Sequence, residues 1–179
     1  MIILVGASAS GKTEVAKLLD SKYHMRKVIT HTTRSIRINE KQDVDYHFVS
    51  EKDFQLLNAN NSFVETTTYN GNHYGTSYAE IGDNKVLIVD PNGLKSFLNL
   101  HDPRIITFYL ISSEKSRLIH MRERGDSETN IEKRLLNDRE KFTDDLKTIC
   151  NFVIDSDSST LSEMADTIFK LYNKSLQSL

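Results

Sequence analysis

The chain begins with a short apolar run that leads directly into a loop of small residues. Residues Ile2–Val5 are followed by Gly6, Ala7, Ser8, Ala9, Ser10, Gly11, Lys12 and Thr13, which fit the pattern GxxxxGK[ST]. The glycines allow the backbone to curl, so that successive N–H groups and the positive end of a following helix point at phosphate oxygens. Lys12 would then reach the β- and γ-phosphates of ATP, and the Thr13 hydroxyl would bind Mg²⁺. The motif therefore predicts a triphosphate-binding loop between a buried strand and a helix.

Further apolar runs indicate that this first strand belongs to a parallel sheet. Runs rich in valine and isoleucine occur at residues 86–89, 105–111 and 152–154. They are continuous rather than alternating, which is typical of strands buried on both faces. Helical patterns stand between them, including one over residues 131–149 behind a capping box of Thr129 and Glu132, and a terminal one behind Thr160 and Glu163. This alternation predicts an α/β fold with helices on both faces of the sheet.

Residues 31–80 interrupt the alternation and predict a small insert with its own architecture. Residues 44–49 alternate in the manner of a strand, and Ser50 with Asp53 is typical of the start of a short helix. Asn70-Gly71 stands between two extended runs and predicts the turn of a hairpin. The insert is therefore expected to be a small mixed α/β unit.

Two polar segments follow the insert. Asp90 ends the run at residues 86–89, at the carboxyl edge where open α/β sheets place their ligands. It would either orient Mg²⁺ through water or cap the helix that begins near Pro91, and the sequence favours neither. Residues 122–130 are charged, contain Gly125 and have almost no apolar side chain, so we expect a mobile loop there.

Composition limits the class of partner and the compartment. The chain has 179 residues, within the span of one domain, and its 23 Lys+Arg against 25 Asp+Glu provide no basic field for nucleic acid or an anionic membrane. The single cysteine, Cys150, excludes an internal disulfide and a CxxC metal site. No apolar run is long enough to span a membrane or to form the core of a signal peptide. We therefore expect a cytoplasmic protein with no nucleic-acid or membrane partner.

Two arginines in the insert suggest a second phosphate site. Arg34 and Arg37 stand three positions apart and precede Tyr46. Two guanidinium groups and a phenol hydroxyl suit a terminal phosphate dianion, because charge-assisted bidentate hydrogen bonds match its oxygens. Arginine pairs are, however, more often solvated surface charge, so the pair alone leaves both interpretations open.

Taken together, the motifs resemble those of the guanylate kinase family. Six segments are similar, in family order: GASASGKT, THTTRSIR, DVDYHFVS, FVETTTYNGNHYGTS, VLIVDPNG and RERGDSETNIEKRL. The resemblance covers nearly the whole chain and implies a P-loop NTPase three-layer fold with a parallel central sheet, a small mixed α/β GMP-binding insert and a lid. It implies a single domain over residues 1–179, with its core at about 1–30, 81–121 and 131–179, the insert at about 31–80 and the lid at about 122–130.

The resemblance also implies roles for individual residues. Those that would hold the GMP phosphate are Arg34, Arg37, Tyr46 and Tyr74, and those that would approach the guanine are Thr30, Glu65 and Thr76. Lys12, Arg124 and Arg134 would act on the transferred phosphoryl group, while Arg122 is better explained by a salt bridge. A carboxylate at Glu65 suits guanine, because N1–H and the 2-amino group are donors that adenine lacks.

The implied reaction is transfer of the γ-phosphoryl group of ATP to GMP or dGMP, with Mg²⁺, by a monomer or a homodimer. The chain departs from the family pattern at two positions. Ile88 stands where relatives commonly have an acidic residue, and His120 stands where many have a lid arginine. Two alternatives stay open: a kinase of the same fold that acts on another phosphorylated acceptor, and a catalytically weak binding domain.

Overall fold

The core of the protein is a parallel sheet of five strands. The computed structural model describes residues 1–69 and 71–179. In the sheet, β1 (Ile2–Val5) lies between β7 (Lys85–Ile88) and β8 (Ile106–Ile111), and every neighbouring pair is parallel. The outer strands are β2 (Arg26–Lys27) beside β7 and β9 (Phe152–Asp155) beside β8. The predicted buried strands and their parallel arrangement are confirmed.

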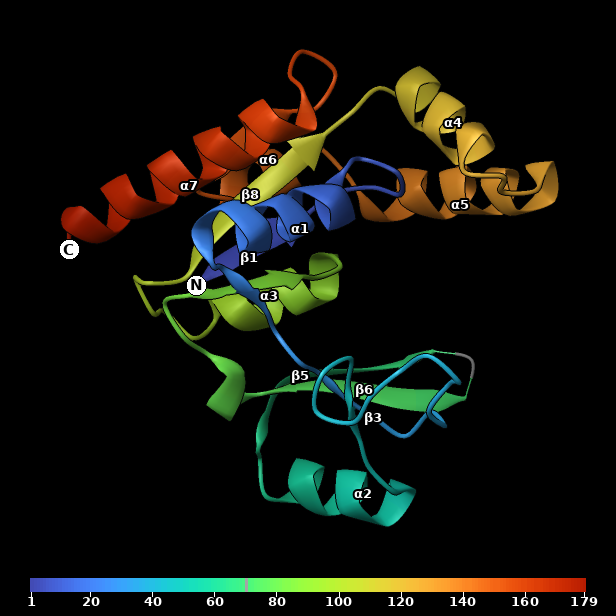
Figure 1. Ribbon diagram of the computed structural model, residues 1–179, viewed down its shortest axis with the longest axis vertical. Coiled ribbons are helices and arrows are strands. Elements are labelled where there is room, and N and C mark those ends of the chain that lie inside the picture. Colours follow the sequence, from blue (N-terminus) through green and yellow to red (C-terminus); the bar gives the residue numbers. More distant parts are fainter. Residues whose placement is uncertain (70) are drawn as a thin grey trace.

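Helices cover both faces of this sheet and produce three layers (Figure 1). Ile2 and Leu4 point into one hydrophobic cluster with α1 (Lys12–Tyr23) and α7 (Leu161–Gln177). Ile3 and Val5 point into a second cluster on the other face, with α3 (Pro91–Leu98) and α6 (Leu146–Ile149). All four side chains of β1 are fully buried, which explains why its sequence is continuously apolar.

The terminal helix begins as predicted, whereas the preceding long helix does not. Thr160 and Glu163 form a complete capping box at the start of α7. In α5 (Glu128–Lys141) the N-cap is Ser127, whose hydroxyl accepts from the Asn130 N–H, so the predicted capping box of Thr129 and Glu132 is wrong. The Ser127 hydroxyl, two residues earlier, satisfies one of the free N–H groups of the first turn and so sets the start of the helix there.

The predicted helix over residues 131–149 is also wrong in its length. Phe142 leaves the helical conformation, with φ −103° and ψ 71°, and α6 follows as a separate turn of helix. Residues 143–145 are Thr-Asp-Asp, whose side chains compete for backbone hydrogen bonds and favour turns. The break allows both Phe142 and Leu146 to pack in the second cluster.

The charged stretch 122–130 is mostly helical, which corrects the expected loop. The helix α4 (Glu114–Glu123) extends into it from one side and α5 from the other, so that only residues 124–127 lie between them. Gly125 has φ 84°, the left-handed conformation that allows α4 to end there. In Figure 1, α4 and α5 lie side by side and project from the core.

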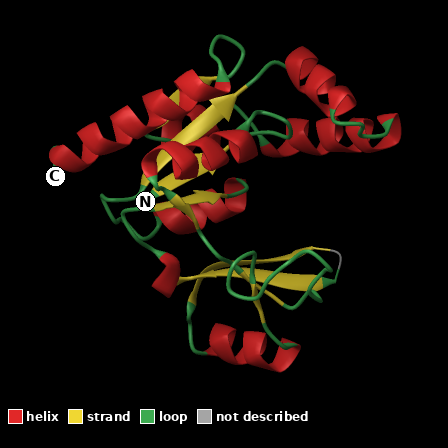
Figure 2. Ribbon diagram, viewed as in Figure 1, coloured by secondary structure: helices red, strands yellow, loops and turns green. Residues whose placement is uncertain are grey.

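The insert contains a second sheet, in the order β4-β3-β6-β5, with one helix packed against it (Figure 2). Its elements are β3 (His31–Thr32), β4 (His47–Phe48), α2 (Glu51–Ala59), β5 (Phe63–Tyr69), β6 (Asn72–Ser77) and the short 3-10 helix η1 (Tyr78–Glu80). The predicted Ser50 cap is present, and Phe54 of α2 stacks on Phe63 of β5. The antiparallel hairpin of β5 and β6 is confirmed. The predicted turn residue Asn70 lies outside the described residues.

The predicted strand at residues 44–49 is present only as β4. The N–H groups of Val44 and Asp45 both donate to the Lys41 carbonyl, so this segment forms a turn. The Val44 side chain is exposed and has no sheet surface to pack against, which explains why alternation alone was misleading here. In the described part of the chain, no helix is long and apolar enough to cross a membrane.

Candidate active site

The loop between β1 and α1 is curled around the ammonium group of its own lysine. Lys12 Nζ donates to the carbonyl oxygens of Gly6 and Ala7, at 2.7 Å each. A side chain at Gly6 would come within 2.5 Å of the Leu110 carbonyl oxygen on β8, so only glycine allows the loop this close to the sheet. Gly11 has φ 91° and forms the N-cap of α1. The positive end of α1 and the lysine therefore meet at one place, as the motif predicts.

Burial changes the charge balance of Lys12. Removal from water lowers its pKa from 10.5 to about 8, and this effect outweighs the attraction of Asp138, which raises the pKa. The nearby Arg117 lowers it further. The loop therefore holds a desolvated ammonium group whose charged form an anionic ligand would stabilise.

A pocket of about 430 Å³ lies against this loop. It is lined by residues of the loop and α1, of α4 and of the segment before α7: Ala9, Ser10, Gly11, Lys12, Thr13, Glu14, His120, Arg124, Ser156, Ser159, Thr160 and Leu161. The Ser156 hydroxyl donates to the Ser10 carbonyl at 3.0 Å, and His120 Nδ1 lies 3.3 Å from the Ala9 carbonyl oxygen.

Sequence analysis did not identify the wall of this pocket formed by Ser156 and residues 159–161. The signal was present, because these residues follow the last strand at the carboxyl edge of the sheet. A larger hollow of about 660 Å³ lies at the opposite, amino ends of β8 and β9, beside Phe97 and Leu179. It does not include any residue of the phosphate loop.

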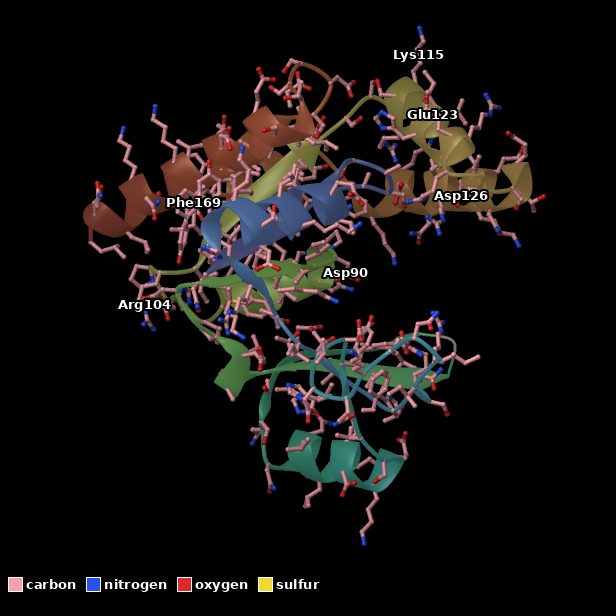
Figure 3. The ribbon with its side chains drawn as sticks, in the orientation of Figure 1. Asp90, Arg104, Lys115, Glu123, Asp126 and Phe169 are labelled. Atoms are coloured by element: carbon pink, nitrogen blue, oxygen red, sulfur yellow. The ribbon has the colours of Figure 1, made fainter. Side chains whose placement is uncertain are left out.

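The two expected lid arginines share one carboxylate. Arg124 Nη2 lies 2.6 Å from Asp126 Oδ2, and Arg134 Nη1 lies 3.6 Å from the same oxygen. Arg124 lines the pocket beside the loop. Arg122 pairs with Glu128 at 2.8 Å, which confirms the expected salt bridge. Figure 3 shows Asp126 at the connection between α4 and α5, a residue that sequence analysis did not select.

In the insert, Arg34 is brought together with two tyrosines and a glutamate. Its guanidinium group lies over the Tyr46 ring at 5.4 Å, and the rings of Tyr46 and Tyr74 are 6.1 Å apart. Two nitrogens of Arg34 bind both oxygens of Glu40, at 2.8 and 3.0 Å. The Arg37 N–H also donates to Glu40, at 2.9 Å. These hydrogen bonds, those of Arg34 above all, lower the pKa of Glu40 despite its partial desolvation.

Glu65 and Thr76 face each other on the neighbouring strands β5 and β6. The Thr76 hydroxyl donates to Glu65 Oε1 at 2.7 Å. Burial raises the pKa of Glu65, the Thr76 hydrogen bond lowers it, and the charge of Asp90 raises it. The helix α3, which begins after Asp90, contacts β5, so the core sheet and the insert approach each other here. Thr30, directly before the insert, accepts the His47 N–H through its carbonyl oxygen at 3.0 Å.

Asp90 caps α3, which is one of the two roles expected for it. Its Oδ1 accepts the Gly93 N–H at 2.8 Å. Figure 3 shows Asp90 at the side of the core that faces the insert. Two positions before it, the Ile88 side chain is 37% exposed, so an aliphatic group stands on that same edge of the sheet.

Comparison with known proteins places the chain among guanylate kinases. The family model described as guanylate kinase matches residues 1–171. The guanylate kinase of Neisseria gonorrhoeae is 32% identical over 171 residues, which are 91% of this chain and 82% of that protein. That of Syntrophus aciditrophicus is 32% identical over 150 residues, 80% of this chain and 72% of the relative. The crystal structure of guanylate kinase from Anaplasma phagocytophilum has the same fold, with a TM-score of 0.68 at 22% identity, over 97% of this chain and 84% of that one.

Proposed function

Because the chain belongs to the guanylate kinase family, we infer that it transfers the γ-phosphoryl group of ATP to GMP, giving ADP and GDP. The observation that carries this inference is the intact phosphate loop, with the Lys12 ammonium held at its centre. Desolvation lowers the pKa of Lys12, so the charged form of this side chain is stabilised when an anionic ligand such as a phosphate binds in the loop. We propose dGMP as a second acceptor.

The loop is proposed to bind ATP through residues Gly6, Ala7, Ser8, Ala9, Ser10, Gly11, Lys12 and Thr13. The adjoining pocket of about 430 Å³ is large enough for a nucleoside and lies on the side of Lys12 and Thr13. Lys12 would exchange its two carbonyl partners for phosphate oxygens. Its charge would then be neutralised by a ligand instead of being held by backbone dipoles.

The insert is proposed to bind GMP, with its phosphate at Arg34, Arg37, Tyr46 and Tyr74 and its guanine at Thr30, Glu65 and Thr76. The bidentate contact of Arg34 with Glu40 supports this, because it is the geometry with which a guanidinium group binds two oxygens of a phosphate. Glu65 already accepts from Thr76 through one oxygen. Its second oxygen is proposed to accept hydrogen bonds from the base.

The reaction needs alignment and charge neutralisation rather than a general base. The acceptor phosphate is a dianion near neutral pH, so it attacks the γ-phosphorus directly and no covalent enzyme intermediate forms. Lys12, Arg124 and Arg134 are proposed to neutralise charge on the transferred group. Arg124 and Arg134 would leave Asp126 to do so, and this exchange would close the lid over the phosphates.

Mg²⁺ is the proposed cofactor. The Thr13 hydroxyl and, through water, Asp90 offer the oxygen ligands that this ion prefers. When bound, the ion would offset the charge of the ATP phosphates. Because Asp90 Oδ1 is engaged with Gly93, the contact would be made by the other carboxylate oxygen.

We also propose the division of the chain into a core, an insert at about 31–80 and a lid at about 122–130. A cytoplasmic location, and a monomer or a homodimer, are proposed with it. The net charge of −2 supports small nucleotides rather than nucleic acid as partners.

One assay tests the proposed function. ADP release is measured with ATP and Mg²⁺ against GMP, dGMP, AMP, CMP, UMP and ribose phosphates, with Lys12→Ala as the blank. Lys17→Ala, on the exposed side of the same helix, is the matched control and should keep full activity. Turnover confined to GMP and dGMP supports the proposal. Turnover on another acceptor would mean that the protein is a kinase for that acceptor. ATP binding without any turnover would mean that it is a binding domain.

A further inference from the structure

A buried ion pair lies behind the phosphate loop, and none of the roles above uses it. Arg117 of α4 and Asp138 of α5 are joined at 2.6 Å, and their side chains are only 8% and 3% exposed. The carboxylate continues to the loop: Ser8 donates its N–H to Asp138 Oδ2 at 3.0 Å and its hydroxyl to Oδ1 at 3.2 Å. Arg117 Nη1 also reaches the Ser8 carbonyl oxygen at 3.4 Å. All three polar groups of Ser8 therefore contact the pair.

The position of Asp138 in its helix makes this arrangement unexpected. Ile131, Leu135, Asp138 and Phe142 follow one another at helical spacing, so a carboxylate occupies a position of the stripe that faces the core. A buried charge is costly unless it is paired and fully hydrogen-bonded. Here the serine of the loop completes the bonding of the carboxylate.

An exposed ion pair also joins α4 to α5, so the buried pair is not the sole link between these helices. Glu114 and Arg139 join the same two helices by an exposed ion pair, and each is close in sequence to one member of the buried pair. The two pairs differ in their contact with the phosphate loop: the buried pair binds Ser8 of the loop, and the exposed pair joins only the two helices.

Asp138 also approaches the loop from outside the nucleotide pocket. That pocket is lined by the loop from Ala9 onward, on the side of Lys12. Asp138 and Arg117 line a different cavity of about 440 Å³, together with Ala7. The carboxylate therefore does not occupy the place of a phosphate but supports the turn that precedes it.

We propose that Asp138, held by Arg117, is a positioning residue that anchors the phosphate loop to the helix carrying Arg134. The inference rests on the proposed function and deepens it. The anchor links the conformation of the loop to the position of α5, because Ser8 and Arg117 both bind the carboxylate that α5 carries. Without the anchor, Ser8 and the N–H groups after it would sample other conformations, and ATP would have to order them on binding.

Two variants separate positioning from stability. The double variant Arg117→Leu with Asp138→Ala removes both charges, so it leaves no lone buried ion and should keep the midpoint of thermal unfolding within a few degrees. It removes the anchor, and we expect kcat/KM for ATP to fall by about 10- to 100-fold, while KM for GMP changes less than about twofold. Asp138→Asn keeps groups that can hydrogen-bond Ser8 but leaves Arg117 unpaired, so it should unfold at a lower temperature and keep KM for ATP within about threefold.

Glu114→Gln is the matched control, because it breaks the exposed pair between the same helices. It should leave both the unfolding midpoint and the kinetics unchanged. Hydrogen exchange of the Ser8 amide gives a readout that does not depend on catalysis. Exchange should be slow in the wild type and in Asp138→Asn, and faster in the double variant.

The proposal is overturned if the double variant folds and keeps kcat/KM for ATP within about twofold of wild type, or if KM follows the unfolding midpoint across the variants. It is equally overturned if the double variant binds ATP more tightly, since Asp138 would then compete with phosphate. If the double variant does not fold, Asp138→Asn decides: slow Ser8 exchange with a KM for ATP raised well beyond threefold overturns the proposal, and Ser8 exchange and KM that stay at, or rise together from, their wild-type values support it. A wild-type protein that binds ATP but does not phosphorylate GMP refutes the proposed function alone, and ATP affinity with amide exchange still tests the anchor.

Discussion

Two partly buried ionisable groups, Lys12 and Glu65, show how single residues prepare the site for its ligands. Desolvation dominates in both cases, lowering the pKa of the lysine to about 8 and raising that of the glutamate. Each is therefore less stable in its charged form than the same group in water. Each gains a partner when a ligand arrives: phosphate for the ammonium group, and guanine N–H donors for the carboxylate.

The lysine predicts a pH dependence. Lys12 is charged below about pH 8 and loses its proton above it, so KM for ATP should rise as the pH increases through 8. Bound phosphates restore the charge, which means that ATP binding should take up a proton at pH 8.5 to 9. Calorimetry in two buffers of different ionisation enthalpy measures this uptake. The same binding enthalpy in both buffers at that pH would contradict it.

The glutamate predicts selectivity for the base. Glu65→Gln places an amide donor where guanine also presents donors, so the ratio of kcat/KM for GMP over AMP should fall by about 10-fold or more. Competition assays with both nucleotides measure the ratio. The matched control is Glu132→Gln, an exposed glutamate of α5, which should leave it unchanged. An unchanged ratio in Glu65→Gln would mean that the base is recognised by other residues.

At the scale of elements, one carboxylate in the connection between α4 and α5 pairs with two arginines. Asp126 binds Arg124 and Arg134, and these bonds keep its pKa low, Arg124 having the larger effect. Both arginines must exchange Asp126 for phosphate oxygens if they act in transfer. The short link of residues 124–127 leaves the exchange to side-chain rotation and to movement of the two helices.

Removing this carboxylate should therefore favour the closed lid. Asp126→Asn should raise kcat/KM for ATP by about two- to fivefold at low ionic strength, and the gain should diminish with added salt because the pair is exposed. Steady-state kinetics at two salt concentrations measure it. Glu128→Gln, which breaks the Arg122 pair on the same segment, should have no effect. A loss of activity in Asp126→Asn would instead indicate that Asp126 orients the arginines for catalysis.

At the scale of the whole molecule, the two proposed nucleotide sites lie on separate sheets. The phosphate loop belongs to the parallel core sheet, and Arg34 belongs to the insert beside its own four-stranded sheet. The two sheets approach each other where α3, which Asp90 caps, contacts β5. Changes in one sheet should consequently affect one substrate far more than the other.

Arg34→Ala tests this separation. Loss of a bidentate phosphate ligand should raise KM for GMP by about 100-fold and leave the dissociation constant of ATP within about twofold. Binding of each nucleotide by calorimetry, together with kinetics, distinguishes the two effects. Arg104→Ala, at the far side of the core (Figure 3), is the control arginine. Equal losses for both nucleotides would contradict separate sites.

Local patterns in the sequence predicted the parts of this protein that depend on near neighbours. The phosphate loop, the continuous buried strands and the caps at Ser50 and Thr160 each follow from a few adjacent side chains and their hydrogen bonds. The same kind of pattern failed where a competing local group intervened. Ser127 displaced the predicted cap, and Phe142 ended a helix whose apolar stripe continued beyond it.

The tertiary structure decided how charges are paired across the chain. Ser8 and Asp138 are 130 positions apart, and no spacing rule relates them. Asp138 was visible in the sequence only as an acidic residue on an apolar stripe, and its meaning depends on Arg117 and the loop that complete its hydrogen bonds. The sequence by itself determined the family, through motifs in their order along the chain. It also determined the phosphate loop, because that loop depends on local backbone geometry. Packing decided which carboxylate pairs with which arginine. Only the folded chain removes such charges from water, and there an unpaired charge costs far more free energy than a paired one.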